Sequence, residues 1–133
     1  KDGFALKHAI KSGLEIYFIT GGKSKGVFVR LINLGVNPDN IYSDCHDKAT
    51  VLKSLIKNGK INPAETAFMG DDLPDYECMR LVHLPCCPAD AVQEIIDISL
   101  YISPKTGGKG CVRDILEKVL KMQDKWVKFE NSK

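Results

Sequence analysis

Apolar residues along this chain follow two patterns that alternate from one end to the other. A spacing of three and four residues, typical of an amphipathic helix, occurs at residues 3–12, 24–34, 47–58, 74–82, 91–97 and 112–123. Short apolar runs, typical of buried strands, occur between them at residues 14–19, 41–42, 66–69, 84–86 and 100–102. We therefore predict helices and strands in strict alternation.

This alternation decides the fold class. Strands that are joined by helices pair in parallel through right-handed crossovers, with helices on both faces of the sheet. The sequence thus predicts an α/β fold with a three-layer, doubly wound parallel sheet, in one domain over residues 1–126 followed by a polar tail over residues 127–133. Ligands of such sheets bind at the carboxyl ends of the strands, so we expect the functional residues there.

Composition narrows the class of partner. The 133 residues carry 19 Lys and Arg against 17 Asp and Glu, a net charge of +2, and only 8% are aromatic. This balance gives no basic field and no stacking surface for nucleic acid, and no apolar run is long enough to cross a membrane. We expect a small substrate or a protein partner, with no nucleic acid and no membrane.

The cysteines indicate a reducing compartment. There are five of them, an odd number without a Cys-x-x-Cys spacing, at positions 45, 78, 86, 87 and 111. A chain with 44% hydrophobic residues needs no disulfide framework. Together with a start that lacks the apolar segment of a signal peptide, this predicts a cytoplasmic protein with core cysteines rather than a zinc site.

Three carboxylates follow the predicted strand at residues 66–69. Asp71, Asp72 and Asp75 lie within five residues, and like charges so close together are unfavourable unless a cation compensates them. Mg²⁺ is a natural compensator, because it binds one or two carboxylates together with water and a substrate phosphate. The alternative is an acidic loop whose first aspartate caps the next helix, and the residues alone leave both interpretations open.

Two more candidates lie after the strand at residues 14–19 and at the start of the third helix. The hydroxyl of Thr20 and the N–H groups of Gly21 and Gly22 precede a helix N-terminus, which attracts phosphoryl oxygens. Lys48 opens a helix, where a cation is unfavourable unless an anion accompanies it. An ordinary turn and an ordinary surface lysine are the respective alternatives.

The order of these residues is more specific than any one of them. Thr20, then Lys48, then the Gly-Asp-Asp-x-x-Asp loop beginning at Gly70 resemble motifs II, III and IV of the haloacid dehalogenase superfamily. A receiver domain has similar residues in a different order. The segments Ile19–Ser24, Gly70–Tyr76, Pro85–Ala91 and Gly107–Asp114 narrow the resemblance to the 3-deoxy-D-manno-octulosonate 8-phosphate phosphatases, and it extends from Lys1 to about Trp126.

The resemblance implies a role for each candidate. Asp71 would be a Mg²⁺ ligand, and Asp72 or Asp75 would support the metal site. Thr20 would bind the phosphoryl group, and Lys48 would neutralise the nucleophile and the phosphate.

The same resemblance implies the substrate contacts and the assembly. Gly21 and Gly22 would approach the substrate, Arg30 would bind its carboxylate, and Lys109 would act from the loop before the last helix. Gly22 departs from the family, in which many members have a charged residue there. Members of this family resemble one another in two ways: they lack a cap domain, and they form homotetramers in which a neighbouring subunit closes each active site.

One family motif has no counterpart in the chain. Family members carry an Asp-x-Asp pair, the nucleophile and the general acid/base, at the end of a first strand. That strand is the central one, between those we predict at residues 14–19 and 66–69. We therefore expect that an N-terminal segment precedes Lys1 in the intact protein or is supplied elsewhere.

The expected function is a Mg²⁺-dependent phosphatase that hydrolyses 3-deoxy-D-manno-octulosonate 8-phosphate in lipopolysaccharide precursor synthesis. Two alternatives stay open. One is a non-catalytic oligomerisation or binding module with a phosphatase-like fold, which the absent Asp-x-Asp pair favours. The other is a phosphatase for a nine-carbon sugar acid, which would differ in its substrate contacts.

Overall fold

The computed structural model describes residues 2–123. Its helices are α1 (Asp2–Lys11), α2 (Lys25–Asn33), α3 (Lys48–Lys57), α4 (Tyr76–Met79), α5 (Gln93–Ile98) and α6 (Cys111–Met122). Its strands are β1 (Phe18–Ile19), β2 (Ile41–Tyr42), β3 (Ala67–Met69), β4 (Leu84–Cys87) and β5 (Tyr101–Ile102). The tail predicted over residues 127–133 lies outside the described residues. Within them, the predicted alternation of helices and strands is confirmed.

The ends of the helices follow from local chemistry. Ser24 caps α2 by accepting a hydrogen bond from the Val27 N–H at 3.2 Å, and Asp47 caps α3 by accepting one from the Thr50 N–H at 3.3 Å. Gly35 follows α2 with φ of +101°, a conformation that favours glycine. These residues stop and start the helices close to where the sequence predicts.

Two predicted elements were too long. The strand predicted at residues 14–19 is paired only at Phe18 and Ile19, because its partner β2 is itself two residues long. The helix predicted at residues 74–82 is a 3₁₀ turn, Leu73–Asp75, followed by the four residues of α4.

The strands form two separate parallel sheets. One has the order β1-β2, and the other has the order β3-β4-β5. Among residues 2–123, no backbone hydrogen bond joins β1 to β3. Ala67 and Met69 of β3 are exposed, as expected for an unpaired edge. The division falls between the two strands that would flank the central family strand.

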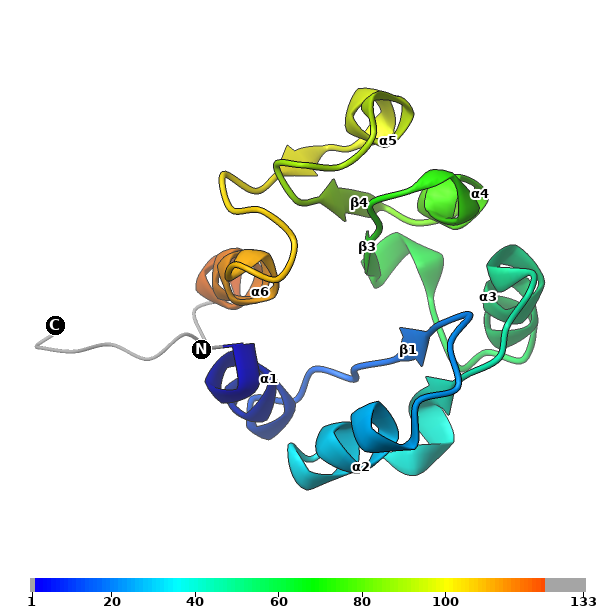
Figure 1. The fold of residues 1–133 in the computed structure, drawn as a ribbon, viewed down its shortest axis with the longest axis vertical. Coiled ribbons are helices and arrows are strands. Elements are labelled where there is room, and N and C mark those ends of the chain that lie inside the picture. Colours follow the sequence, from blue (N-terminus) through cyan, green and yellow to red (C-terminus); the bar gives the residue numbers. More distant parts are fainter. Residues whose placement is uncertain (1, 124–133) are drawn as a thin grey trace, which may run out of the picture.

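Helices cover the sheets on both sides, as in a three-layer fold (Figure 1). α1 and α6 pack against each other on one side, and α3 and α4 lie on the other. The core is divided accordingly. Buried side chains under α3 and α4 include Ala49, Leu52, Leu55, Ile61 and Cys78, and those between α4, β4 and α5 are Met79, Cys87, Ala91 and Ile95.

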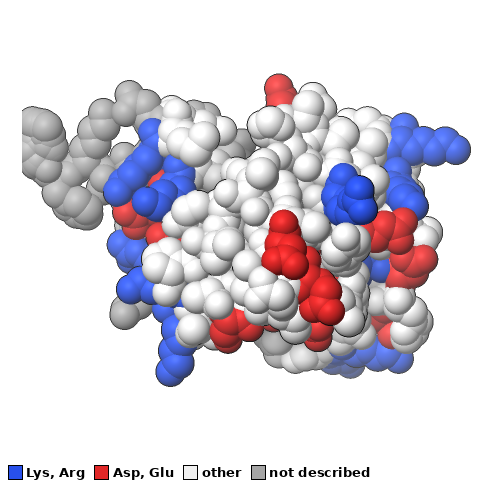
Figure 2. All heavy atoms as spheres, turned by 90° about the horizontal axis from the view of Figure 1, so that it is seen from above, with Lys and Arg blue, Asp and Glu red and all other residues white. Residues whose placement is uncertain are grey.

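On the face seen in Figure 2, both signs of charge occur: acidic side chains lie near the centre, and most basic side chains lie towards the two edges. None of the helices within residues 2–123 combines the length and the apolar character that a membrane crossing requires.

Candidate functional site

The loop after β1 carries the first candidate, Thr20. Its N–H donates to the Tyr42 carbonyl at 2.9 Å, the bond that closes the last pair of the β1-β2 ladder, between Ile19 and Tyr42. Its Oγ1 accepts a hydrogen bond from the Gly22 N–H at 3.1 Å. Residues 20–24 are all exposed. The hydroxyl and the backbone of Gly21 and Gly22 are therefore open to solvent at the carboxyl end of a strand.

The segment after β2 ties this loop to α3. The Cys45 N–H donates to the Thr20 carbonyl at 3.0 Å, and the Asp44 N–H donates to the Gly22 carbonyl at 2.9 Å. Asp44 has φ of +56°, the left-handed region that costs a residue other than glycine about 1 kcal/mol or more. Nothing in the sequence pattern signals this conformation, and sequence analysis missed Asp44 as a support of the Thr20 loop.

A buried ion pair joins α3 to the loop after β3. Lys48 Nζ lies 2.8 Å from Asp75 Oδ1, with 21% of the Lys48 side chain and 6% of the Asp75 side chain exposed. The other oxygen, Oδ2, accepts hydrogen bonds from the Asp71 N–H at 3.0 Å and the Asp72 N–H at 3.4 Å. One carboxylate thus binds the lysine and two backbone amides, which explains why it is tolerated in a buried position.

Asp72, and not Asp71, caps the turn that follows this loop. Its Oδ1 accepts a hydrogen bond from the Leu73 N–H at 2.7 Å, and it forms a capping box with Asp75. The residue that caps the next turn is therefore Asp72. The interpretation in which the first aspartate of the loop is the cap is wrong.

The Asp71 carboxyl is destabilised in its charged form by its surroundings. Its pKa is raised, first by partial burial and then by the neighbouring charges of Asp75 and Asp72. A bound cation would offset this repulsion. Among residues 2–123, no three His, Cys, Asp or Glu side chains converge as a complete metal site. A metal ion bound here would need ligands besides these side chains, such as water and a phosphate. Mg²⁺ typically binds in this way.

The remaining candidates are placed apart from this pair. Arg30 lies in the last turn of α2, and Lys109 lies in the loop before α6. Within the described part of the chain, no hydrogen bond or ion pair joins either side chain to Lys48 or Asp75. The structure therefore brings together Lys48, Asp71, Asp72 and Asp75, connects them to Thr20 through residues 43–47, and leaves Arg30 and Lys109 at the periphery.

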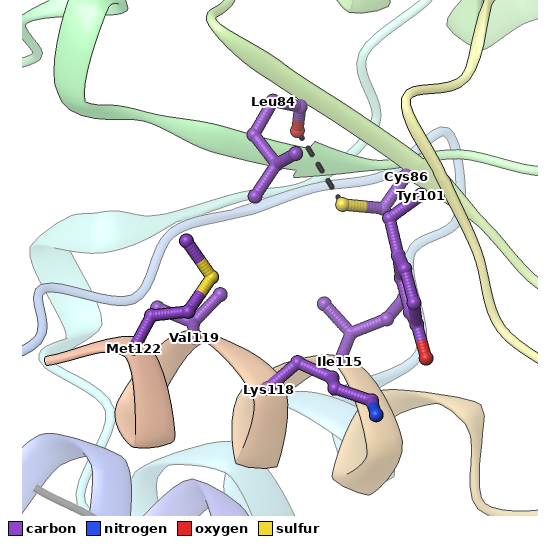
Figure 3. A pocket seen from close by; sticks show the side chains of 7 residues that line it. All are labelled: Leu84, Cys86, Tyr101, Ile115, Lys118, Val119 and Met122. Atoms are coloured by element: carbon purple, nitrogen blue, oxygen red, sulfur yellow. Dashed lines mark hydrogen bonds between the residues drawn. The ribbon is translucent and has the colours of Figure 1, made fainter. Parts of the chain in front are cut away.

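A separate pocket lies beneath α6, away from these residues (Figure 3). It has a volume of about 240 Å³ and is lined by Leu84, Cys86, Tyr101, Ile115, Lys118, Val119 and Met122. Burial raises the pKa of the Cys86 thiol to about 12, and burial followed by the Asp114 hydrogen bond raises that of Tyr101 to about 12. Neither group is a nucleophile or a base near neutral pH, so we do not assign the chemistry to this pocket.

The chain is similar to known proteins along most of its length. Residues 37–115 match the family of haloacid dehalogenase-like hydrolases. The 3-deoxy-D-manno-octulosonate 8-phosphate phosphatase KdsC of Escherichia coli (strain K12) is 33% identical over 125 residues, which are 94% of this chain and 65% of the relative. KdsC of Yersinia pestis is 30% identical over 94% of this chain and 66% of its own length. The chain thus spans about two thirds of the length of these curated relatives.

Solved structures agree with this similarity. The crystal structure of 3-deoxy-D-manno-octulosonate 8-phosphate phosphatase from Moraxella catarrhalis, in complex with magnesium, phosphate and KDO, has a TM-score of 0.86 and 35% identity, covering 92% of this chain and 70% of that one. The enzyme from Yersinia pestis has a TM-score of 0.87 and 31% identity, covering 93% of this chain and 66% of that one. The predicted three-layer α/β fold is confirmed by these likenesses.

Proposed function

The chain belongs to the haloacid dehalogenase-like hydrolase family, and from that membership we propose that the protein is a Mg²⁺-dependent phosphatase of 3-deoxy-D-manno-octulosonate 8-phosphate. The observation that carries the proposal is the buried Asp75, which binds Lys48 and the amides of Asp71 and Asp72 at the carboxyl end of β3. Relatives over 94% of the chain are phosphatases of this substrate.

The acidic loop fits a magnesium ion through Asp71. Both oxygens of Asp75 already have hydrogen-bond partners, and Asp72 caps the following turn. The Asp71 carboxyl, whose pKa is raised by burial and by like charges, would be stabilised in its charged form by a cation. We therefore assign Asp71 as the direct ligand, with Asp72 and Asp75 in supporting positions. Bound Mg²⁺ supplies positive charge to the phosphoryl oxygens.

The other groups of the site would bind the phosphate. The Thr20 hydroxyl and the Gly21 N–H offer donors to its oxygens on an exposed loop before α2, and the Gly22 N–H, which donates to Thr20 Oγ1 in this structure, would turn to the phosphate when it binds. Lys48, held by Asp75, offers a fixed positive charge. Positioned donors and charges of this kind stabilise the charge that develops during phosphoryl transfer.

The nucleophile in this proposal is the first aspartate of an Asp-x-Asp pair on an additional central strand. The unpaired edges of β1 and β3 are where such a strand would add, which would bring its carboxyl end between Thr20 and Asp71. The carboxylate would attack phosphorus and release the sugar acid, and water would then hydrolyse the aspartyl phosphate.

Substrate contacts and assembly complete the proposal. Arg30 and Lys109 would bind the sugar acid, and both lie on exposed segments. We also propose the homotetramer of the family, supported by the exposed apolar side chains of α2, with Val27 55% and Val29 53% exposed.

The five cysteines are free thiols, the state that a reducing compartment maintains. This supports the cytoplasmic location that we propose, while the place in lipopolysaccharide precursor synthesis is proposed from the family resemblance alone.

The test is phosphate release by the full-length protein from 3-deoxy-D-manno-octulosonate 8-phosphate, with Mg²⁺ and with a chelator. We expect phosphate release only with Mg²⁺. In Asp71→Asn we expect kcat to fall by about 100-fold or more. Asp97→Asn is the matched control, since Asp97 is an exposed aspartate of α5 that binds Gln93.

Three outcomes would change the proposal. Full activity in Asp71→Asn would contradict the assignment of the metal ligand. Faster hydrolysis of a nine-carbon sugar acid phosphate would change the substrate and keep the reaction. No hydrolysis of either compound by a folded protein would favour the non-catalytic module.

A further inference from the structure

The loop before α6 is fastened to the turn after β4. The Ala89 N–H donates to the Lys105 carbonyl at 2.9 Å, and the Gly107 N–H donates to Asp90 Oδ1 at 2.8 Å. Asp90 lies 17 residues before Gly107 in the sequence. Among residues 2–123, this is the side-chain hydrogen bond that joins the two segments.

The same turn is bonded to the acidic loop. The Val92 N–H donates to the Asp71 carbonyl at 3.0 Å. The Asp71 N–H in turn donates to Asp75 Oδ2 at 3.0 Å. A continuous series of hydrogen bonds therefore extends from Asp75, through the backbone of Asp71 and the turn at residues 88–92, to the loop at residues 105–110.

Hydrogen bonds within this loop set its local conformation but do not attach it to the turn after β4. The buried Ser103 accepts a hydrogen bond from the Lys105 N–H at 3.0 Å, and the Lys109 N–H donates to the Thr106 carbonyl at 3.0 Å. Gly108 and Gly110 have φ of +76° and +99°. Because glycine, having no Cβ, restricts the backbone less than other residues do, the position of Lys109 relative to the acidic loop depends on the anchor outside the loop.

We infer that Asp90 is a positioning residue, which holds the loop at residues 105–110 where Lys109 can bind the sugar acid. The inference rests on the proposed function for its substrate. An aspartate suits this position because a carboxylate forms a stronger hydrogen bond to a backbone N–H than a neutral acceptor does. A Cβ at Gly107 would lie 3.6 Å from Asp90 Oδ1, so the Asp90 carboxylate lies directly against position 107 without a clash.

The first arm of the test is kinetic and uses the full-length protein. In Asp90→Ala we expect KM for 3-deoxy-D-manno-octulosonate 8-phosphate to rise about fivefold, with kcat changed less than about twofold. KM for 4-nitrophenyl phosphate, which has no sugar acid, should stay unchanged. Asp90→Asn keeps an acceptor oxygen and should restore most of the affinity. Asp97→Ala, the same substitution on α5, should leave both KM values unchanged.

The second arm measures the loop without activity. Trypsin can cleave after Lys105 and Lys109, and we expect cleavage there to be about fivefold faster in Asp90→Ala than in the wild type, Asp90→Asn or Asp97→Ala. Equal cleavage rates would overturn the inference, as would faster cleavage with an unchanged KM for the sugar acid phosphate. If the wild type hydrolyses neither substrate, the proposed function and the substrate role of Asp90 both fail, while trypsin still decides whether Asp90 anchors the loop.

Discussion

The loops after β1 and β3 carry the two halves of the candidate site, and they are held in different ways. In the loop after β3, the buried carboxylate of Asp75 binds Lys48 and two backbone amides. In the loop after β1, residues 20–24 are all exposed. They are held by the Gly22 N–H bond to the Thr20 hydroxyl, by the Ser24 cap of α2, by backbone contacts to residues 42–45 and by a solvent-exposed ion pair between Lys23 and Asp44.

The difference shows which half depends on the folded core. Buried, fully bonded polar groups fix the geometry around them, because breaking one bond leaves a charge without compensation. An exposed loop has water as an alternative partner, so little free energy holds it in one conformation. We expect the acidic half to be formed before ligand binds and the Thr20 half to become ordered when phosphate binds.

The largest effect should come from a methyl group at Gly70. A Cβ there would lie 2.5 Å from the Asp75 Cβ and 2.8 Å from the Met79 sulfur, so the Asp75 side chain must move. We expect Gly70→Ala to lower the free energy of unfolding by about 3 kcal/mol. Gly21→Ala is the matched control, since its Cβ would lie 3.6 Å from the Cys45 carbonyl oxygen, and it should change stability by less than about 1 kcal/mol. Urea denaturation compares them, and equal losses would contradict the difference between the loops.

Lys48 and Lys53, both on α3, form ion pairs that differ in their exposure to solvent. Lys48→Met would leave the Asp75 carboxylate buried without its cation, at a cost of about 2 kcal/mol. Lys53, also on α3, pairs with Glu77 at 2.7 Å, but 56% of the Lys53 and 63% of the Glu77 side chain are exposed. Lys53→Met should therefore cost much less stability than Lys48→Met. Thermal or urea unfolding measures both, and a cost for Lys53→Met as large as that for Lys48→Met would show that burial does not decide the strength of these pairs.

Asp71 should have the smallest effect and the opposite sign. Its pKa is raised in the folded protein, so the folded state holds the proton more tightly, and stability falls as the pH rises from 3.8, the ordinary value, through the raised pKa. Asp71→Asn should thus stabilise the metal-free protein by a few tenths of a kcal/mol at pH 7, after screening by solvent. The gain should vanish below about pH 3.8. Urea titrations at the two pH values test this, and a loss of stability at pH 7 would contradict it.

Much of the fold could be predicted because its signals are local. Helix α6 was predicted from apolar residues at helical spacing and a preceding glycine, and it begins one residue earlier than predicted, at Cys111. The length of β1 could not be predicted, since it depends on pairing with the short β2 rather than on its own apolar residues. Likewise, Pro74 and the capping box set a 3₁₀ turn where helical spacing predicts a helix.

The site could be predicted as a set of residues but not as a set of contacts. The sequence treats Asp71, Asp72 and Asp75 as three similar carboxylates. Their different positions depend on Lys48, which is 27 residues away from its partner Asp75. Asp90 lies in a segment that carries the family resemblance, but the sequence does not show its contact, because its partner is a backbone N–H in another loop.

The most direct test of the account is amide hydrogen exchange of the full-length protein, with and without Mg²⁺ and inorganic phosphate. Without ligands, we expect the Asp71 and Asp72 amides to exchange at least about tenfold more slowly than those of Gly21 and Gly22. With both ligands, protection should increase mainly at residues 20–24. Equal protection of the two loops without ligands, or no change at residues 20–24 when phosphate and Mg²⁺ are present, would contradict a site with one preformed half and one half ordered by phosphate.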